Sequence, residues 1–282
     1  MLTNLASSVL ARYERFNSER QLAVLRKTIG TGLRRGAETR LMRLRDAVGF
    51  EGKRVLEIGG DLEGNLARAC VALGAEHVTS INHDRDFEPR EDARVTLLKM
   101  DAREIDFPGM KFDLVLGFAV LEHVREIEEM LERVYTVTKP GGHVSLHGGP
   151  LWHCHIGHHL IVRGSSGQDW RFDRSGNAIN PLEDWAHLLR EPAELRDRLV
   201  HRGVPGPDSA EIVEYVFSTD LVNRYSVAHI KQCFYDSRFS VLQCREGVDK
   251  RRRADITALL ATKYGLPESE FQTNSIEFLL RK

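Results

Sequence analysis

The stretch VLEIGGDLEGNLARA, residues 55–69, decides the fold class of this chain. Its first residues are apolar and predict a short strand over 54–58, and its last residues have the spacing of a helix over 64–73. Gly59 and Gly60 stand between them, where a tight strand-to-helix turn needs residues without a Cβ. A strand, a glycine turn and a helix in this order begin a βαβ unit, from which parallel sheets are built.

The same alternation continues along the chain. Further strands are expected over 77–81, 95–100, 112–117, 142–147, 239–246 and 274–281, and helices over 127–137 and 226–237. This pattern predicts an α/β fold with a Rossmann-like, mostly parallel sheet of seven strands and helices on both faces. Ligands of such sheets bind at the carboxyl ends of the strands, so functional residues are expected just after each strand.

Two regions lie outside this alternation. Residues 1–50 have apolar residues at helical spacing and predict an N-terminal helical cap, which covers the sheet or forms a homodimer contact, with a substrate lid as the alternative. Residues 51–282 form the predicted main domain, and 149–225 leave its sheet after the fifth strand as a lid-like insertion. The insertion holds all three tryptophans, five of the nine prolines and six of the twelve histidines. An excursion of this length is usually a binding element.

Composition narrows the class of protein and its partners. The net charge is −1, which argues against a broad surface for nucleic acid or anionic lipid. No run of 18 apolar residues occurs, so no membrane span is expected. The four cysteines are widely spaced and are interpreted as reduced thiols of a cytoplasmic protein.

The segment FDLVLGFAVLEHV, residues 112–124, is the most specific in the chain. It resembles the fourth-strand signature of class I S-adenosylmethionine-dependent methyltransferases, and residues 55–69 resemble the first motif of that family. The segment LERVYTVTKPGGHVSLHGG, residues 131–149, resembles the helix, turn and fifth strand that follow. The resemblance covers 53–149, and it implies a Rossmann-like methyltransferase with S-adenosylmethionine as the methyl donor.

In this family the first motif holds the amino-acid end of the cofactor. The resemblance implies that Glu57 faces the cationic amino group, and that Gly59 and Gly60 let the backbone approach the cofactor. The family alternates glycines after the acid, whereas this chain has Asp61 at the second glycine position and Glu63 at the third. Asp61 is expected to bind the cofactor together with the turn. The altered pattern leaves open a non-catalytic domain that binds S-adenosylmethionine for regulation or scaffolding.

The next strands are expected to hold the nucleoside of the cofactor. Asn82 ends the second strand, where the family usually has an acid that binds the ribose, so Asn82→Asp is expected to be tolerated or to tighten binding. Asp101 and Ala102 follow the third strand and resemble the pair that holds the adenine through a side chain and a backbone N–H. The resemblance also implies that Gly117 and Phe118, at the end of the fourth strand, line the cofactor pocket.

Four other polar residues are weaker candidates. The pattern favours a structural or pocket-wall position for His123, with a general base as the alternative, and a local cap or ion pair for Glu122. Asn223 and Arg224 immediately precede the predicted helix over 226–237 and are candidates for contact with an acceptor.

The segment GGPLWHCHIGHHL, residues 148–160, follows the strand whose end is expected to face the substrate. Histidine accepts a proton near neutral pH, so His158 and His159 are the candidates for a catalytic base or a substrate ligand. A divalent metal site on His153, His155 and His158 is the second interpretation, if the loop curls. The third is a polar loop whose histidines are held by structural hydrogen bonds.

These features together predict an S-adenosylmethionine-dependent O-methyltransferase. The expected acceptor is a small polar molecule, with a sugar unit of a glycan or glycosylated metabolite as the favoured case, because the insertion mixes aromatic and hydrogen-bonding residues. The alternatives are the non-catalytic domain described above and a metal-dependent small-molecule methyltransferase. An RNA methyltransferase is disfavoured, because the charge is near neutral and the tetrapeptide typical of base-amine methylation is absent after the fourth strand.

Overall fold

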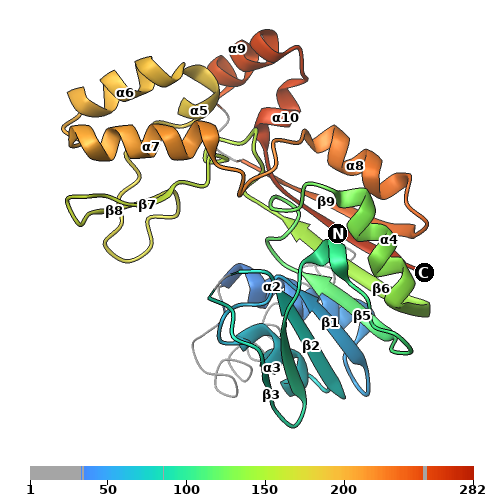
Figure 1. The fold of residues 1–282 in the computed structure, drawn as a ribbon. Coiled ribbons are helices and arrows are strands. Elements are labelled where there is room, and N and C mark those ends of the chain that lie inside the picture. Colours follow the sequence, from blue (N-terminus) through green and yellow to red (C-terminus); the bar gives the residue numbers. More distant parts are fainter. Residues whose placement is uncertain (1–32, 34, 85, 250–252) are drawn as a thin grey trace, which may run out of the picture. The chain divides into compact units, whose positions relative to one another are not determined.

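The computed structural model describes residue 33 and residues 35–84, 86–249 and 253–282. Its main sheet has eight strands: β1 (Arg54–Ile58), β2 (His77–Asn82), β3 (Arg90–Glu91), β4 (Val95–Lys99), β5 (Phe112–Gly117), β6 (Thr138–Gly148), β9 (Ser240–Val248) and β10 (Thr273–Arg281). Their order is β3-β4-β2-β1-β5-β6-β10-β9 (Figure 1). The seven predicted strands are all present. The eighth, β3, has two residues and pairs antiparallel with β4, and a strand so short leaves no alternation in the sequence.

Nine helices are described, of which four follow one another between β8 and β9. They are α2 (Arg35–Val48), α3 (Asn65–Ala72), α4 (Ile127–Val137), α5 (Ala186–Leu189), α6 (Pro192–His201), α7 (Gly206–Ser218), α8 (Val227–Tyr235), α9 (Ala254–Tyr264) and α10 (Glu268–Gln272), with a 3-10 turn at Ala102–Glu104. The predicted N-terminal cap includes α2, whereas its residues 1–32 lie outside the described residues. Among the described residues, no helix is long and apolar enough to cross a membrane.

The chain divides into two compact units. Unit 1 comprises the described residues up to Phe118 together with Glu132–Ser145 and Leu280–Lys282. Unit 2 comprises Ala119–Leu131 and Leu146–Leu279, and it includes the predicted insertion 149–225. Strand β6 passes from one unit to the other, and the two units are described separately below.

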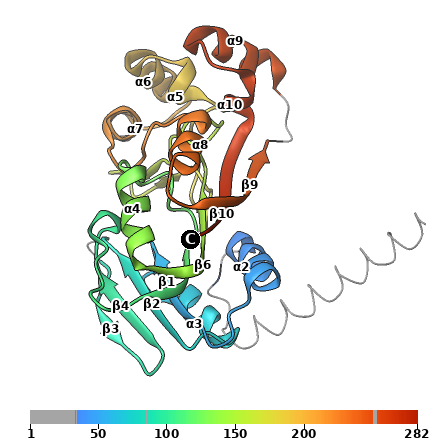
Figure 2. The ribbon, with the colours of Figure 1, turned by 90° about the vertical axis from the view of Figure 1, so that its right-hand side faces the viewer.

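Unit 1 is built on parallel strands buried on both faces. Strand β1 pairs parallel with β2 and with β5, and its residues Val55 and Leu56 are fully buried. Strands of this kind have nearly continuous apolar runs, because helices cover both faces. Helix α3 packs against β2 and β4 (Figure 2). The carboxyl ends of β1, β2 and β4 therefore meet at one edge of the sheet, where the predicted cofactor residues follow them.

Unit 2 contains the strand pair and helices of the insertion. Strands β7 (Ile161–Arg163) and β8 (Asp169–Arg171) form an antiparallel pair, and helices α6 and α7 lie side by side (Figure 1). Trp170 belongs to one apolar cluster of this unit, and Trp152 and Trp185 belong to another. All three rings are at most 8% exposed, so they pack the interior of the unit. The tryptophans that the sequence offered as an aromatic surface for a sugar are core residues.

Candidate functional site

The glycine turn after β1 is held closely against the end of β2. The N–H groups of Gly59 and Gly60 both donate to the carbonyl oxygen of Ile81, at 2.8 Å and 3.1 Å. Gly59 has φ +73°, a conformation that side chains with a Cβ rarely adopt. A Cβ on Gly60 would lie 1.9 Å from Ser80 Oγ. Both glycines are therefore required by the turn, in agreement with the sequence prediction.

Glu57 lies beneath this turn and is 1% exposed. Burial raises the pKa of its carboxyl group from 4.5 to about 8, the hydroxyl of Ser80 offsets part of this, and the charge of Asp61 adds to it. Neither Glu57 Oε2 nor Ser80 Oγ has a hydrogen bond of good geometry among the described residues. A buried carboxylate is stable only when a cation or a donor reaches it. Glu57 thus fits the cationic amino group of S-adenosylmethionine.

Asp61 has a structural use that its position in the glycine pattern did not predict. Its Oδ1 accepts from the backbone N–H groups of Glu63 and Asn65, both at 3.1 Å, and its Oδ2 accepts from that of Leu66 at 3.2 Å. The N–H groups of Asn65 and Leu66 are donors at the start of α3, which otherwise have no partner within the helix, and Glu63 lies in the turn before it. The departure from the alternating glycines is therefore a helix cap. A contact between Asp61 and the cofactor stays a prediction.

Asn82 supports the glycine turn from β2. Its Nδ2 donates to the carbonyl oxygen of Gly60 at 2.7 Å, and its Oδ1 accepts from the N–H of Asp84 at 2.9 Å. The side chain thus uses a donor that an aspartate lacks. The structure therefore favours the amide at this position. It argues against the expectation, drawn from the family resemblance, that Asn82→Asp is tolerated.

The carboxyl end of β4 lies next to Asn82, because the N–H of Met100 donates to the carbonyl oxygen of Asn82 at 3.0 Å. Asp101 follows directly. Its carboxylate accepts from the backbone and the guanidinium of Arg103, and these contacts hold the pKa of Asp101 below its usual value. Three other residues predicted to line the cofactor pocket also belong to unit 1: Ala102, Gly117 and Phe118. The contacts of Asp101 and Ala102 with adenine, and of Gly117 and Phe118 with the cofactor, stay predictions.

The two histidines predicted as bases both lie in unit 2, and Nε2 of each is buried with no hydrogen-bond partner among the described residues, but they differ in which nitrogen carries the proton. His158 is fully buried, and its Nδ1 accepts the N–H of Leu160 at 3.1 Å. In the neutral ring the proton therefore sits on Nε2, and the lone pair of Nδ1 is already used. Burial lowers the pKa of His158 well below its usual value. These features indicate a structural histidine.

His159 has the opposite arrangement. Its Nδ1 lies 3.0 Å from the carbonyl oxygen of Gly157, which only accepts, so Nδ1 carries the proton and Nε2 carries the lone pair. Nε2 is buried and has no hydrogen-bond partner among the described residues. Burial, reinforced by His123, lowers the pKa of His159 to about 4, so the ring is neutral at pH 7. The backbone has φ +46°, and its carbonyl oxygen accepts from the hydroxyl of Tyr215 at 2.9 Å.

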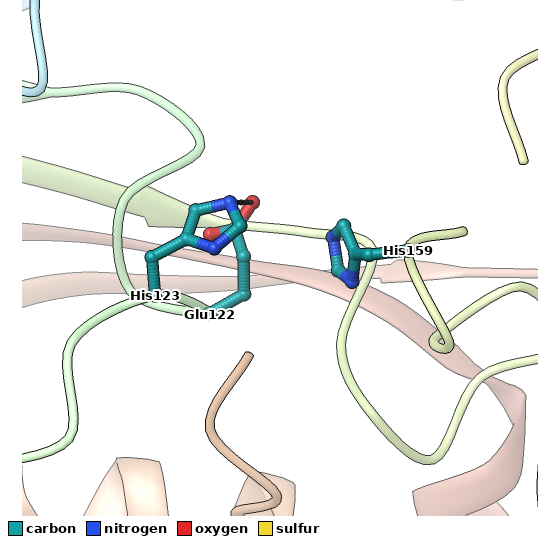
Figure 3. A group of neighbouring side chains, drawn as sticks. All are labelled: Glu122, His123 and His159. Atoms are coloured by element: carbon teal, nitrogen blue, oxygen red, sulfur yellow. Dashed lines mark ion pairs between the residues drawn. The ribbon is translucent and has the colours of Figure 1, made fainter. Parts of the chain in front are cut away.

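His159 meets two residues that the sequence interpretation treated as structural. One ligating atom each of Glu122, His123 and His159 lies within 4.8 Å of the others. The imidazole rings of His123 and His159 are neighbours tilted by 62°, with their centroids 5.3 Å apart, and Figure 3 shows the carboxylate of Glu122 beside the ring of His123. His123 Nδ1 lies 2.6 Å from the carbonyl oxygen of Leu221, and its Nε2 lies 4.0 Å from Glu122 Oε1. We refer to these three residues as the Glu–His–His cluster.

The segment that carries Glu122 and His123 is fixed by Asn223. Asn223 Nδ2 donates to the carbonyl oxygens of Leu121 and Val124, at 2.5 Å and 2.7 Å. The backbone N–H of Asn223 donates to the carbonyl oxygen of Glu122 at 2.8 Å. Asn223 is buried, so it positions the cluster and does not offer its side chain to an acceptor, as the sequence had allowed.

The metal set predicted from the histidine segment does not form. His155 Nδ1 pairs with Asp249 Oδ2 at 2.9 Å, His153 Nδ1 lies 4.0 Å from Glu270 Oε2, and His158 packs against another ring. Tight turns in this loop point neighbouring histidines toward different partners. Within the described residues, only the Glu–His–His cluster and a second group, Glu128, His229 and Cys233, place three potential ligands so close.

Comparison with known proteins identifies relatives of this chain. Residues 31–202 match the sequence profile of a family described as a methyltransferase domain. The ubiquinone biosynthesis O-methyltransferase of Marinobacter nauticus is 29% identical over 180 residues, which is 58% of this chain and 69% of that protein. The ubiquinone biosynthesis O-methyltransferase of Chelativorans sp. is 33% identical over 35% of this chain. The mitochondrial one of Mus musculus is 30% identical over 33% of this chain. The chain covers only 41% and 28% of these two relatives.

One solved structure supports the fold, and a second is reported beside it. Phosphoethanolamine N-methyltransferase 2 of Haemonchus contortus, in complex with phosphomonomethylethanolamine and S-adenosylhomocysteine, aligns with a TM-score of 0.50 at 16% identity. The alignment covers 93% of this chain and 57% of that one. An S-adenosylmethionine-dependent methyltransferase of Mesorhizobium loti aligns with a TM-score of 0.49 at 17% identity, over 86% of this chain and 96% of that one.

Proposed function

The chain belongs to the methyltransferase domain family of class I, S-adenosylmethionine-dependent enzymes, and on this basis we propose that it methylates a hydroxyl oxygen of a small polar acceptor. The names of the relatives, which are O-methyltransferases, support oxygen as the methylated atom. A sugar unit is the finer proposal for the acceptor, although the buried tryptophans give it no stacking surface.

S-adenosylmethionine supplies a methyl group on a sulfonium, which is already a strong electrophile. An oxygen–carbon bond forms as the carbon–sulfur bond breaks, and its electron pair stays on the sulfur of S-adenosylhomocysteine. The hydroxyl group must lose its proton in the process. The protein therefore has to hold the donor, align the acceptor and take one proton. We propose that Glu57, the glycine turn, Asn82 and Asp101 do the first of these.

The observation that carries the proposal is the lone pair on His159 Nε2. It is buried, neutral at pH 7 and without a partner among the described residues, so it is available to receive the proton of a hydroxyl group. His158 lacks such a lone pair, because its Nδ1 accepts from Leu160. We therefore propose His159, and not His158, as the catalytic residue of the predicted pair.

The test compares His159→Ala with His201→Ala. His201 is an exposed histidine of the same unit and belongs neither to the Glu–His–His cluster nor to the group of Glu128, His229 and Cys233. Release of S-adenosylhomocysteine is measured with a panel of sugars, phenols and amines. Transfer to a hydroxyl compound that falls by about 10² to 10⁴ in His159→Ala alone would support the proposal. Transfer to amines only, or equal rates in both variants, would contradict it.

Two further predictions concern the surroundings of the enzyme. We propose a cytoplasmic protein, and localisation of a tagged full-length chain would test this. Helix α2 buries Leu41 and Leu44 within the chain, which favours a cap on the sheet over a homodimer contact for this helix. Sedimentation of the full-length chain would show whether a homodimer forms.

A further inference from the structure

We propose that a cavity at the amino ends of the sheet strands in unit 1 binds a small phosphate monoester. The cavity measures about 220 Å³ and is formed by the end of α2, the residue before β1 and the beginnings of β5 and β6. Its polar lining residues are Lys53, Asp113, Lys139 and His143, which are all half-buried. All of them belong to unit 1, so the cavity is formed within one unit.

The cavity lies at the opposite edge of the sheet from the predicted cofactor residues. Lys53 immediately precedes β1, whereas Glu57 and Gly59 stand at the other end of this strand. A strand rises about 3.3 Å per residue, so Lys53 and Gly59 are roughly 20 Å apart. A ligand in the cavity therefore does not overlap the predicted cofactor site, and both ligands can be bound at once.

Lys139 opens the Lys-Pro-Gly-Gly turn at the start of β6, a segment to which the proposed function gives no task. Its Nζ lies 2.8 Å from both carboxylate oxygens of Asp113, and Asp113 Oδ2 also accepts from the backbone N–H of Arg54 at 2.9 Å. Burial raises the pKa of Asp113, but the contacts with Lys139 and Arg54 outweigh it and hold the pKa below its usual value. The ion pair fixes the ammonium group of Lys139 at the wall of the cavity.

The two lysines keep donors that the protein does not use. Lys53 Nζ donates to the carbonyl oxygen of Val48 at 3.1 Å, and Lys139 Nζ donates to the two oxygens of Asp113. An ammonium group has three N–H donors. Among the described residues Lys53 uses one of them and Lys139 uses two, so the remaining donors of both groups are available to a ligand.

Positive charge exceeds negative charge around the cavity. The lining has two ammonium groups and one carboxylate, and the guanidinium of Arg281 lies beside it, 3.9 Å from the position that a Cβ on Gly141 would take. Burial, Arg281 and Lys53 together lower the pKa of His143, so this ring is mostly uncharged at pH 7. A phosphate monoester carries a charge of about −1.5 to −2 at this pH, and lysine binds phosphate as a point charge. The surroundings of the cavity therefore favour such an anion.

The size of the cavity favours a phosphate ester over a free phosphate ion. One water molecule needs roughly 10–15 Å³ of such space, so about 220 Å³ is more than a phosphate group fills. Val48 and Pro140 provide an apolar wall for an organic part. Gly141 and Gly142 line the cavity without bringing a side chain into it.

The experiment titrates the full-length chain, saturated with S-adenosylhomocysteine, with glycerol phosphate by calorimetry at constant ionic strength. One glycerol phosphate per chain is expected. Lys53→Met and Lys139→Met should each weaken its binding by at least ~10-fold, because each removes a hydrogen bond between charged groups. Lys263 is an exposed lysine of unit 2, and Lys263→Met is the matched control that should bind as the parent does.

Two further readouts separate a built site from general attraction to a basic surface. Asp113→Asn should tighten the binding of glycerol phosphate, because it releases the ammonium group of Lys139 while an amide oxygen still accepts from Arg54. The pKa of His143, followed by nuclear magnetic resonance, should rise when glycerol phosphate binds, because the anion offsets the neighbouring cations that lower it.

Four outcomes would overturn the proposal. They are no saturable binding of glycerol phosphate, equal binding by the parent and both lysine variants, competition with S-adenosylhomocysteine, and binding of acetate or inorganic phosphate as tightly as the ester. Competition would place the ligand in the cofactor site, and equal binding of the smaller anions would remove the reason for an ester. If Lys139→Met fails to bind S-adenosylhomocysteine and is therefore not folded, Lys53→Met and Asp113→Asn decide the question.

Discussion

Replacement of Glu57 by Gln should remove a pH dependence from the binding of S-adenosylmethionine. Burial raises the pKa of Glu57 to about 8 in the free protein, so its carboxyl group is mostly protonated at pH 7. An ion pair with the cationic amino group of the cofactor requires the carboxylate. Each pH unit below this pKa therefore costs roughly 1.4 kcal/mol of binding, or about tenfold in affinity. At pH 7 the complex should release roughly 0.9 proton.

The assay is calorimetric titration between about pH 6 and pH 7.5, in buffers of different ionisation enthalpy. This range keeps the amino group of the cofactor cationic, since such groups titrate near pH 8. The parent protein should bind more tightly as pH rises and should release a proton. Glu57→Gln should show neither effect, and the exposed residue Asp106 provides the control Asp106→Asn, which should behave as the parent does. A flat profile for the parent, with Glu57→Gln binding equally well, would refute the assignment of Glu57 to the amino group.

The same pKa has a consequence for the stability of the free protein. The folded state holds a proton on Glu57 that the unfolded chain loses above about pH 4.5, so folded protein binds more protons between about pH 4.5 and 8. The contribution of Glu57 to the free energy of unfolding is unchanged below this window and becomes less favourable as pH rises through it. Denaturation at several pH values should show that Glu57→Gln gains stability relative to the parent as pH approaches 8. A constant difference across this window would contradict the burial of an unpartnered carboxyl group.

Three more substitutions test the assignments made from contacts. Asn82→Asp loses the donor to Gly60 and places a carboxylate against a carbonyl oxygen, so we expect about 1–3 kcal/mol less stability by urea denaturation; unchanged stability would show that this hydrogen bond does not support the turn. Gly60→Ala brings a Cβ to 1.9 Å from Ser80 Oγ and should cost about 1–3 kcal/mol, and Ser80→Ala should recover part of it in a double-mutant cycle. Additive effects would show that the two residues do not touch. His158→Ala should lower the free energy of unfolding by about 2 kcal/mol or more while the folded fraction keeps its turnover, and a loss of turnover at full stability would make His158 the catalytic residue.

The capping role of Asp61 removes the reason for regarding the first motif as degenerate. The sequence pattern compares residue types at aligned positions, and there an aspartate replaces a glycine. In the structure its carboxylate accepts from the first two N–H groups of α3 and from that of Glu63 in the turn before it, and Gly64 has φ +67° in the same turn. In this turn an aspartate side chain caps the helix at a position where the family has a glycine. The chain is an S-adenosylmethionine-dependent methyltransferase, as the motifs predicted.

The sequence by itself determined the sheet and the residues of the predicted cofactor site. Strands β1, β2, β4 and β5 are buried runs of apolar residues between helices, a pattern that is local and follows from the geometry of each element. The parallel arrangement then requires their carboxyl ends to meet at one edge. Glu57, Gly59 and Asn82 could therefore be placed without coordinates, because a few residues along one strand decide where each of them lies.

The tertiary structure alone decided which histidine is available and what it faces. His158 and His159 are neighbours in the sequence and have identical chemistry, but Leu160 occupies the lone pair of one and Gly157 orients the other. The meeting of His159 with Glu122 and His123 joins segments that are distant in the chain. Hydrogen-bond partners and burial set the proton position and the pKa of an imidazole, and both depend on contacts made only after the chain has folded.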